Sequence, residues 1–220
     1  MVGVVHGTAG RSVEIGKVGG RSNARWGAYF ERVVAKACEE WLAQRPDVVH
    51  LFHDLANLRN VRGAGLAPIS LGDSNIDHVV LSGADWLMLE AKGCAKGELR
   101  VEGGQGCLVQ TDGRVLPQPW LDDQKARSRY GALVRLTDRK CGKIIYVLPD
   151  GVSFDHHSVK MARAFSVREV KAIVTVSAVE QGALDEFFPV NQPPADPADI
   201  ARLVERLSHQ GESTRQNIEL

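Results

Sequence analysis

The stretch Ile76–Lys92, IDHVVLSGADWLMLEAK, decides the fold of this chain. It holds two apolar runs, IDHVVL and WLMLEAK, and each run has the length of a β-strand. The four residues between the runs, SGAD, are typical of a turn. The pattern therefore predicts that the two runs pair as an antiparallel β-hairpin.

The turn decides which residues of the two strands face each other. Gly83 suits the first central position of a type II′ turn, and Ser82 then lies opposite Asp85. Counting outward from this pair, we expect Asp77 to lie opposite Glu90. A four-residue loop keeps this register, whereas a three-residue loop would place the two acids on opposite faces of the hairpin.

Three charged side chains then gather at the end of the hairpin away from the turn. Residues two apart in a strand share a face, so Lys92 points the same way as Glu90 and Asp77. Cross-strand neighbours lie about 5 Å apart at Cβ, which lets two carboxylates bind one divalent cation. Mg²⁺ or Mn²⁺ prefers such oxygen ligands, and the Ala91 carbonyl is a further candidate ligand. A cation there can activate water against a phosphodiester, and Lys92 can orient that water or neutralise the transition state.

Other interpretations of these residues remain open at this point. An unpaired acid in an apolar strand is costly, and a salt bridge from Asp77 to Lys92 would offset that cost without any catalysis. The trio would then be part of a structural core. The E-x-K pattern is also common by chance, and it recurs as Glu169–Lys171, downstream of Asp155. Because Asp155 lies in the polar segment FDHHS, we interpret the second pattern as a surface pair.

Four features of the sequence together resemble a known family. They are Glu31 on a predicted helix, IDH at 76–78, LEAK at 89–92 and Gln124 at the start of a second predicted helix. These features resemble the nuclease-related domain (NERD) family of the PD-(D/E)XK phosphodiesterase superfamily, over about residues 23–150. The resemblance implies an α/β fold with a PD-(D/E)XK-like αβββαβ core, in which a mixed central sheet is flanked by helices.

The same resemblance implies roles for individual residues. Asp77, Glu90 and Lys92 would be the metal-binding and catalytic trio. Glu31 would support the metal or its water from the first helix. Gln124 would lie at the rim of the site.

Charge is unevenly distributed along a chain whose net charge is zero. Residues 124–143 hold seven Lys and Arg against one Asp, and residues 180–220 hold eight acids against three Arg. A concentrated basic stretch is compatible with a phosphate-backbone partner, here DNA, with RNA left open. The alternative interpretation is a solvated helix face. The predicted nucleic-acid contacts lie on a helix after Pro119: Lys125, Arg127, Arg129 and Arg135.

We expect three segments along the chain. They are a flexible, glycine-rich basic arm over residues 1–22, a nuclease-like domain over residues 23–190, and a linker with a C-terminal helix and tail over residues 191–220. Apolar periodicity predicts helices and strands in the mixed order of an α/β fold. The predicted helices cover about residues 23–43, 120–136 and 199–209, and the further strands cover about residues 48–52, 98–102, 107–110, 143–148 and 172–176.

Composition and histidine spacing narrow the class of protein. The longest apolar run, Ile144–Leu148, is far shorter than the ~20 residues of a membrane span, so we expect no membrane partner. The four cysteines lie far apart and the amino end does not resemble a signal peptide, so we expect free thiols and a cytoplasmic protein.

His50 and His53 point to opposite faces of a strand, which argues against shared metal ligation. His78 faces away from Asp77, and we expect it to form hydrogen bonds in the core or at an interface, with a contact to nucleic acid as the alternative.

The leading hypothesis is a Mg²⁺- or Mn²⁺-dependent nuclease that hydrolyses phosphodiester bonds in DNA. The alternative from another class is a non-catalytic or regulatory nucleic-acid-binding module with the same fold. The presence of all three members of the trio favours the enzyme. The sequence leaves open endonuclease or exonuclease action, the form of the nucleic acid and the oligomeric state.

Overall fold

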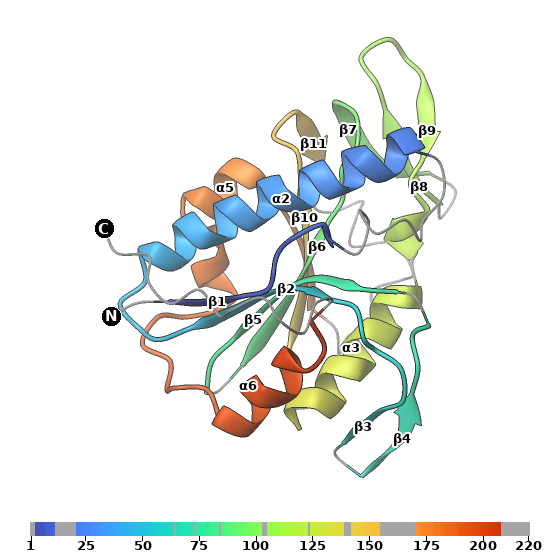
Figure 1. Cartoon of the computed structure of the whole chain (residues 1–220). Coiled ribbons are helices and arrows are strands. Elements are labelled where there is room, and N and C mark those ends of the chain that lie inside the picture. Colours follow the sequence, from blue (N-terminus) through green and yellow to red (C-terminus); the bar gives the residue numbers. More distant parts are fainter. Residues whose placement is uncertain are drawn as a thin grey trace.

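The structure is a computed structural model of the whole chain (Figure 1). It describes residues 3–11, 21–63, 65–72, 74–83, 85–102, 105–122, 124–138, 142–154 and 170–207. Within these ranges, the side chains at positions 21–24, 122, 124, 125, 170 and 171 lie outside the description. The predicted surface pair involving Glu169 and Asp155 also lies outside the described residues.

A mixed sheet of six strands forms the centre of the fold. Its strands are β1 (Val4–His6), β2 (His50–Leu55), β5 (Ile76–Leu81), β6 (Trp86–Ala91), β10 (Lys143–Leu148) and β12 (Val170–Thr175), in the order β1-β2-β5-β6-β10-β12. β2, β5 and β6 pair antiparallel, whereas β6, β10 and β12 pair parallel, and β1 is parallel to β2. The prediction of an α/β fold with a mixed central sheet is therefore confirmed.

The β5–β6 hairpin has the register that the turn residues predict. Its ladder runs from the turn to His78, which pairs with Leu89. One further step along the same ladder places Asp77 opposite Glu90. The register is therefore as predicted, but the predicted turn type is wrong. Gly83 does not have the positive φ of the first central residue of a type II′ turn, and its amide instead donates to the Pro193 carbonyl at 2.7 Å.

Helices cover both faces of the sheet (Figure 1). One face carries α2 (Arg21–Ala43) and α5 (Val176–Glu180), and the other carries α3 (Gln124–Thr137) and α6 (Pro197–Val204). The end of α2 at Ala43 agrees with the predicted helix. Among the described residues, no helix combines the length and the apolar character that crossing a bilayer requires.

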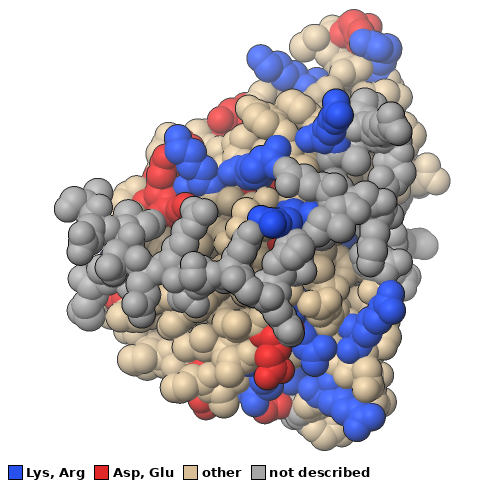
Figure 2. Space-filling view, viewed as in Figure 1, with Lys and Arg blue, Asp and Glu red and all other residues tan. Residues whose placement is uncertain are grey.

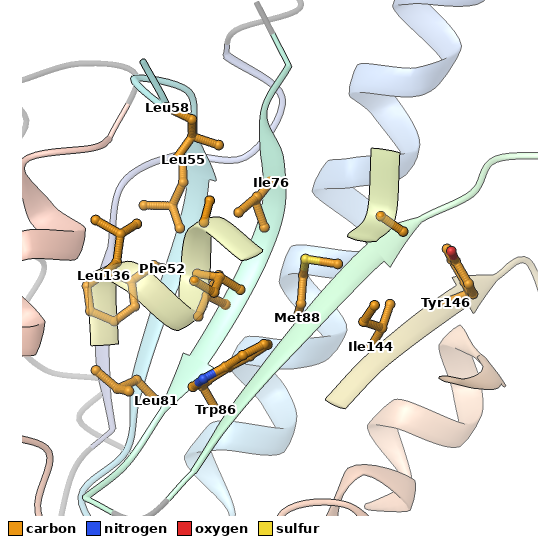
Figure 3. Packing of buried hydrophobic residues seen from close by; sticks show 14 of the residues in the cluster. Phe52, Leu55, Leu58, Ile76, Leu81, Trp86, Met88, Leu136, Ile144 and Tyr146 are labelled. Carbon is orange, nitrogen blue, oxygen red and sulfur yellow. The ribbon is translucent and has the colours of Figure 1, made fainter. Parts of the chain in front are cut away.

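Two apolar clusters, one on each face, hold the layers together. The cluster under α2 includes Val34, Cys38, Trp41, Leu51, Val80, Leu87 and Ile145. The cluster under α3 includes Phe52, Val79, Trp86, Met88, Ile144 and Tyr146, several of which Figure 3 shows against Leu136 of α3. Burying one such side chain stabilises the fold by about 1.5–3 kcal/mol. Along β6 and β10, successive residues enter opposite clusters, so the strand pattern fixes which of their side chains can reach which helix.

A second sheet and a small hairpin extend from the central sheet (Figure 1). The second sheet has the order β11-β7-β8-β9 and contains β7 (Gly97–Glu102), β8 (Gln105–Val109), β9 (Val115–Pro117) and β11 (Val152–Phe154). The strands predicted near 98–102 and 107–110 are therefore present, but in a separate sheet. The small hairpin consists of β3 (Val61–Gly63) and β4 (Leu66–Ile69). It is tied to α3 by Arg135, whose Nε donates to the Ala67 carbonyl at 2.8 Å.

Part of the predicted flexible arm belongs to the sheet, which corrects the segment boundary at residue 22. Val4–His6 form β1, and the Val4 amide donates to the Val49 carbonyl at 2.9 Å. Val5 is buried. The backbone partners that β2 supplies outweigh the glycine-rich composition of this segment, and composition alone does not reveal them.

Part of the predicted linker and tail is also packed against the core. A 3-10 turn, η1 (Pro119–Asp122), leads into α3, and a second one, η2 (Ala183–Glu186), precedes the C-terminal segment. α6 begins at Pro197, two residues before the predicted start, because the Asp196 side chain caps it by accepting from the Ala198 amide at 2.8 Å. Arg202 Nε donates to the Leu136 carbonyl, and Leu203 is fully buried. Burial of Leu203 thus makes α6 part of the domain and not a tail.

The thiols of three cysteines are free, as predicted. Cys38 and Cys107 are buried, and Cys94 is partly buried. Cys141 lies outside the described residues.

Candidate active site

Asp77 and Glu90 are buried neighbours at the end of the β5–β6 hairpin. Asp77 is 6 % exposed and Glu90 is fully buried. Asp77 Oδ2 accepts a hydrogen bond from the Ala91 amide at 2.9 Å, which anchors the Asp77 carboxylate beside the strand that carries Glu90. The structure therefore brings together the two acids that the hairpin register predicts.

Two cations contact the same oxygen of Glu90. Lys92 Nζ lies 2.9 Å and Arg129 Nη1 lies 2.6 Å from Glu90 Oε2. The other oxygen, Oε1, is buried and has no hydrogen-bond partner among the residues that the structure describes. A buried carboxylate is stable only with charged partners. Lys92 therefore pairs with Glu90, whereas the salt bridge considered from the sequence joined Lys92 to Asp77. Arg129 from α3 is a second partner of Glu90, which was not expected at this position.

Glu31 reaches the site from α2. Its side chain is buried, and its Oε2 has no hydrogen-bond partner within the described part of the chain. Burial raises the pKa of Glu31 to about 9, and the carboxylates of Asp77 and Asp54 add to this rise. Glu31 therefore carries a proton at neutral pH in this arrangement.

Burial also raises the pKa of Asp77, to about 6, and the charge of Glu90 acts in the same direction. The charges of Lys92 and Arg129 and the Ala91 amide oppose this rise. Asp77 is consequently ionised for the most part at pH 7. The site holds several buried carboxyl groups close together, a charge pattern that a bound cation would relieve.

Lys92 keeps its positive charge. Burial works against the charged form, but the carboxylates of Glu90 and Asp77 outweigh it and raise the pKa of Lys92. Its Nζ lies 5.9 Å from the ring centroid of Tyr146, within the range of a cation–π contact. A permanently charged Lys92 suits stabilisation of negative charge and not abstraction of a proton.

Asp54 is a member of the site that the sequence analysis missed. It is fully buried at the end of β2, and its backbone has φ 57°, a left-handed conformation that is uncommon outside glycine. Asn75 Nδ2 donates to Asp54 Oδ1 at 3.2 Å. The only signal in the sequence is an acid inside the otherwise apolar run HLFHDL. Strained conformations of this kind are found at functional sites.

The four predicted nucleic-acid contacts do not share one environment. Arg129 bonds to Glu90 inside the site, with a side chain only 12 % exposed, and its contact with nucleic acid stays a prediction. Arg135 donates to the Ala67 and Gly131 carbonyls and holds the β3–β4 hairpin, so it too serves the fold. Arg127 is exposed on α3. The Lys125 side chain lies outside the described residues.

Gln124 is placed by its backbone only. It is the first residue of α3, as predicted from the resemblance, but its side chain lies outside the description. Its position at the rim of the site stays a prediction. The Ala91 carbonyl as a metal ligand stays a prediction as well, since the contact shown for Ala91 is the one from its amide.

The four histidines that the structure describes form two pairs, and His53 Nε2 also lies 3.3 Å from Glu39 Oε1. His78 is buried on the α2 side of the sheet and shares a hydrogen bond with His53, Nδ1 to Nδ1, at 2.8 Å, which confirms the prediction for His78. His50 Nδ1 lies 3.0 Å from His6 Nε2. His50 and His53 therefore have different partners, in agreement with their spacing. Burial lowers the pKa of His6 to about 4, so this histidine is neutral at physiological pH.

The donors at the site suit a hard cation that keeps most of its water ligands. Across the described residues, no group of three or more His, Cys, Asp or Glu side chains is arranged to hold a metal ion. Mg²⁺ does not need such a cage, because it is commonly held by one or two carboxylates together with substrate phosphate and water. The buried Glu90 Oε1 and Glu31 Oε2 are oxygens of the required type without a partner in the described chain. The carboxyl oxygens present are therefore donors of the kind that Mg²⁺ or Mn²⁺ takes.

In comparisons with known proteins, no family model, no curated protein and no solved structure matches this chain.

Proposed function

We propose that this protein is a Mg²⁺- or Mn²⁺-dependent nuclease that hydrolyses phosphodiester bonds in DNA. The observation that carries the proposal is the arrangement of Asp77, Glu90 and Lys92 at one end of the β5–β6 hairpin, with Glu31 added from α2. When β1 and the elements outside the central sheet are left aside, α2, β2, β5, β6, α3 and β10 follow one another in the αβββαβ order that the resemblance to the NERD family predicts, which supports the proposal.

Each side chain has a role that follows from its charge and burial. Asp77 and Glu90 would hold the cation, which when bound would polarise the phosphoryl group and lower the pKa of a water molecule. Lys92 stays protonated and would stabilise the negative charge that develops on the phosphate. Glu31 carries a proton near pH 7 and would bind or release it at its carboxyl group as the charge of the site changes.

DNA is the substrate class that charge supports. Arg129 already reaches the site, and Arg127 is exposed on the same helix. Phosphates along a DNA backbone need cations at such positions. The resemblance to a nuclease family points in the same direction.

A second candidate function is a regulatory nucleic-acid-binding module that does not cleave. One observation favours it: Glu90 is already neutralised by Lys92 and Arg129. A carboxylate with two cationic partners binds a metal ion less strongly than a carboxylate without them. This candidate predicts DNA binding without turnover in the presence of Mg²⁺ or Mn²⁺.

The experiment is incubation of the purified protein with closed circular and linear DNA, with Mg²⁺, with Mn²⁺ or with EDTA. Cleavage should require the metal, and Asp77→Asn, Glu90→Gln and Lys92→Met should each lower the rate by about a hundredfold or more. The matched control is Glu98→Gln, because Glu98 is an exposed acid whose partner is Arg100. Its rate should equal that of the wild type.

The outcomes separate the three interpretations. Equal cleavage in EDTA would contradict the proposal, and DNA binding without cleavage under any metal would establish the regulatory module. If all three variants unfold, the trio is a structural ion-pair core. Circular dichroism and thermal melting of each variant therefore accompany the activity assay.

A further inference from the structure

A pair of exposed aromatic side chains lies on α2, outside the two apolar clusters. Trp26 is 50 % exposed and Tyr29 is 51 % exposed. Their rings stack on each other with centroids 5.4 Å apart and an interplanar angle of 30°. Large aromatic rings are usually buried, so two half-exposed rings that stack suggest a binding surface.

This aromatic pair adjoins the candidate active site. The indole of Trp26 packs against Gly93, where an added Cβ would lie 2.9 Å from the indole Nε1. Gly93 directly follows Lys92, whose Nζ bonds to Glu90. Trp26 is also five residues before Glu31 on the same helix. The exposed rings are therefore at the rim of the acidic site.

The surface around the rings is basic. Arg25 and Arg32 are exposed and lie four residues before and three residues after Tyr29, so all three share one face of α2. The section 21–38 of the chain holds four Lys and Arg and a single acid, Glu31. Figure 2 shows Lys and Arg side chains along the band of this view where Figure 1 places α2. Flat rings between cations suit a nucleotide, which offers a base to stack and a phosphate to pair.

We propose that Trp26 and Tyr29 form a stacking platform for an unpaired base of single-stranded DNA, next to the phosphate held at the acidic site. The inference rests on the proposed function for the position of that phosphate. In duplex DNA each base is stacked inside the helix and out of reach of a side chain beside its own phosphate. A platform at the rim therefore selects a single strand, or a strand opened from its partner. The platform is indifferent to sequence, because every base has a π-face.

The first experiment measures binding without chemistry. Anisotropy of fluorescein-labelled dT₁₂ and of a labelled 12-base-pair duplex is followed in EDTA, for the wild type and for Trp26→Ala/Tyr29→Ala. The double variant should bind dT₁₂ about tenfold more weakly, within the range for loss of one stacked base, and should bind the duplex as the wild type does. Trp26→Phe/Tyr29→Phe should retain most of the affinity. Val190→Ala serves as the matched control, because Val190 is an exposed apolar residue, 42 % exposed, in the segment that Arg45 holds at the far end of α2.

The second experiment places the base relative to the cleaved bond. Oligonucleotides with a single abasic position next to the mapped cleavage site are cleaved with Mg²⁺ by both proteins. One abasic position should lower the kcat/KM of the wild type as much as the double substitution lowers kcat/KM on the intact oligonucleotide. The same abasic position should not lower the kcat/KM of the double variant any further. Such non-additivity is the signature of two groups that contact each other. Additive losses at every position would overturn the platform.

The two proposals fail in distinguishable ways. If the wild type cleaves DNA but the double variant binds dT₁₂ as tightly as the wild type does, the stacking platform is wrong and the nuclease activity is supported. If the protein binds dT₁₂ through the two aromatic rings but cleaves no DNA, the proposed nuclease activity is wrong and the base-binding surface is supported. A double variant that changes only the sedimentation of the protein, from dimer to monomer, would assign the rings to contact between two copies and overturn the platform.

Discussion

Arg129 Nη1 lies 2.6 Å from Glu90 Oε2, so the basic helix α3 sends one of its arginines into the acidic site. The two residues are 39 positions apart in the chain and come from different layers of the fold. Their contact connects the segment that would follow DNA with the carboxylate that would hold a metal ion. Arg129 therefore belongs with Lys92 as a positive group of the site.

If the protein is the proposed nuclease, the contact with Glu90 would make Arg129 a determinant of its rate. We expect Arg129→Ala to lower cleavage at saturating DNA by about 10- to 100-fold, because it removes a cation beside the reacting phosphate and one partner of buried Glu90. Arg129→Lys should recover part of the rate. Single-turnover kinetics at saturating substrate measures this effect. If the Arg129→Ala variant keeps the wild-type rate but binds DNA more weakly, Arg129 contacts the DNA backbone and does not act on the rate.

Arg127 is expected to act on binding alone. It is exposed on α3, so it would pair with a phosphate and release one counterion. Arg127→Ala should flatten the plot of log affinity against log salt by about 0.9 for duplex DNA, with no change in rate at saturation. Filter binding or anisotropy over a range of KCl concentrations gives the slope. An unchanged slope would mean that the exposed part of α3 is a solvated face.

Glu31 should make the stability of the protein depend on pH. Its pKa is about 9 in the fold against an ordinary value of 4.5, so the folded state binds more protons between these values and stability falls as pH rises through this window. Glu31→Gln removes this loss. The variant should match the wild type near pH 4 and be more stable at pH 8 by about 1 kcal/mol or more, a rise in Tm of roughly 2–4 °C.

Differential scanning fluorimetry from pH 4 to pH 9 tests the effect of Glu31. Glu40→Gln is the control, because the Glu40 side chain forms an exposed pair with Lys36 on the same helix and its loss should change stability by about 0.5 kcal/mol or less at any pH. A Glu31→Gln protein that is less stable than the wild type at pH 8 would show that the ionised carboxylate has a stabilising partner.

Substitution of Gly63 should destabilise the β3–β4 hairpin much more than substitution of Gly65. A Cβ at Gly63 would lie 1.9 Å from the Arg135 carbonyl oxygen, so Gly63→Ala forces the hairpin away from α3. We expect a cost of about 3 kcal/mol. Gly65 has φ 64° and open space around it, so Gly65→Ala should cost only about 1 kcal/mol from backbone strain. Urea unfolding of the two variants distinguishes the effects, and equal midpoints would contradict the packing of β3 on α3.

The central hairpin could be predicted because its signals are local. The spacing of Ser82 and Asp85 sets the register even though Gly83 does not form the predicted type II′ turn. Alternation along the two strands then fixes Asp77 and Glu90 on one face. Lys92 follows from the period of two. No contact with a distant segment is needed for any of these positions, and all three residues lie together in the structure.

Features that depend on packing between distant segments could not be predicted. The direction of the Arg129 side chain follows from the rotation of α3 about its axis. Packing between layers sets this rotation, as where the ring of Tyr130 packs on Trp86 with centroids 4.9 Å apart. The left-handed backbone at Asp54 has no residue signature. The long loop before the hairpin carries β3 and β4, whose short runs give too little periodicity to recognise. The strands of the second sheet show the same alternation of apolar and polar residues as the strands of the central sheet. The alternation therefore does not predict which sheet a strand joins.

The short strand β1 has a consequence for handling the protein. β1 is the outermost strand on one side of the central sheet and pairs with β2 over Val4–His6. Removing it would uncover the N–H and C=O groups along one side of β2, which offer a ready template for strands of other molecules. A truncation or tightly fused tag that disturbs residues 3–6 would therefore cause aggregation, even though the acidic site and its helices are unchanged. Tags at that end need a spacer, and a soluble yield that falls on deletion of Gly3–His6 is the expected sign of the uncovered edge.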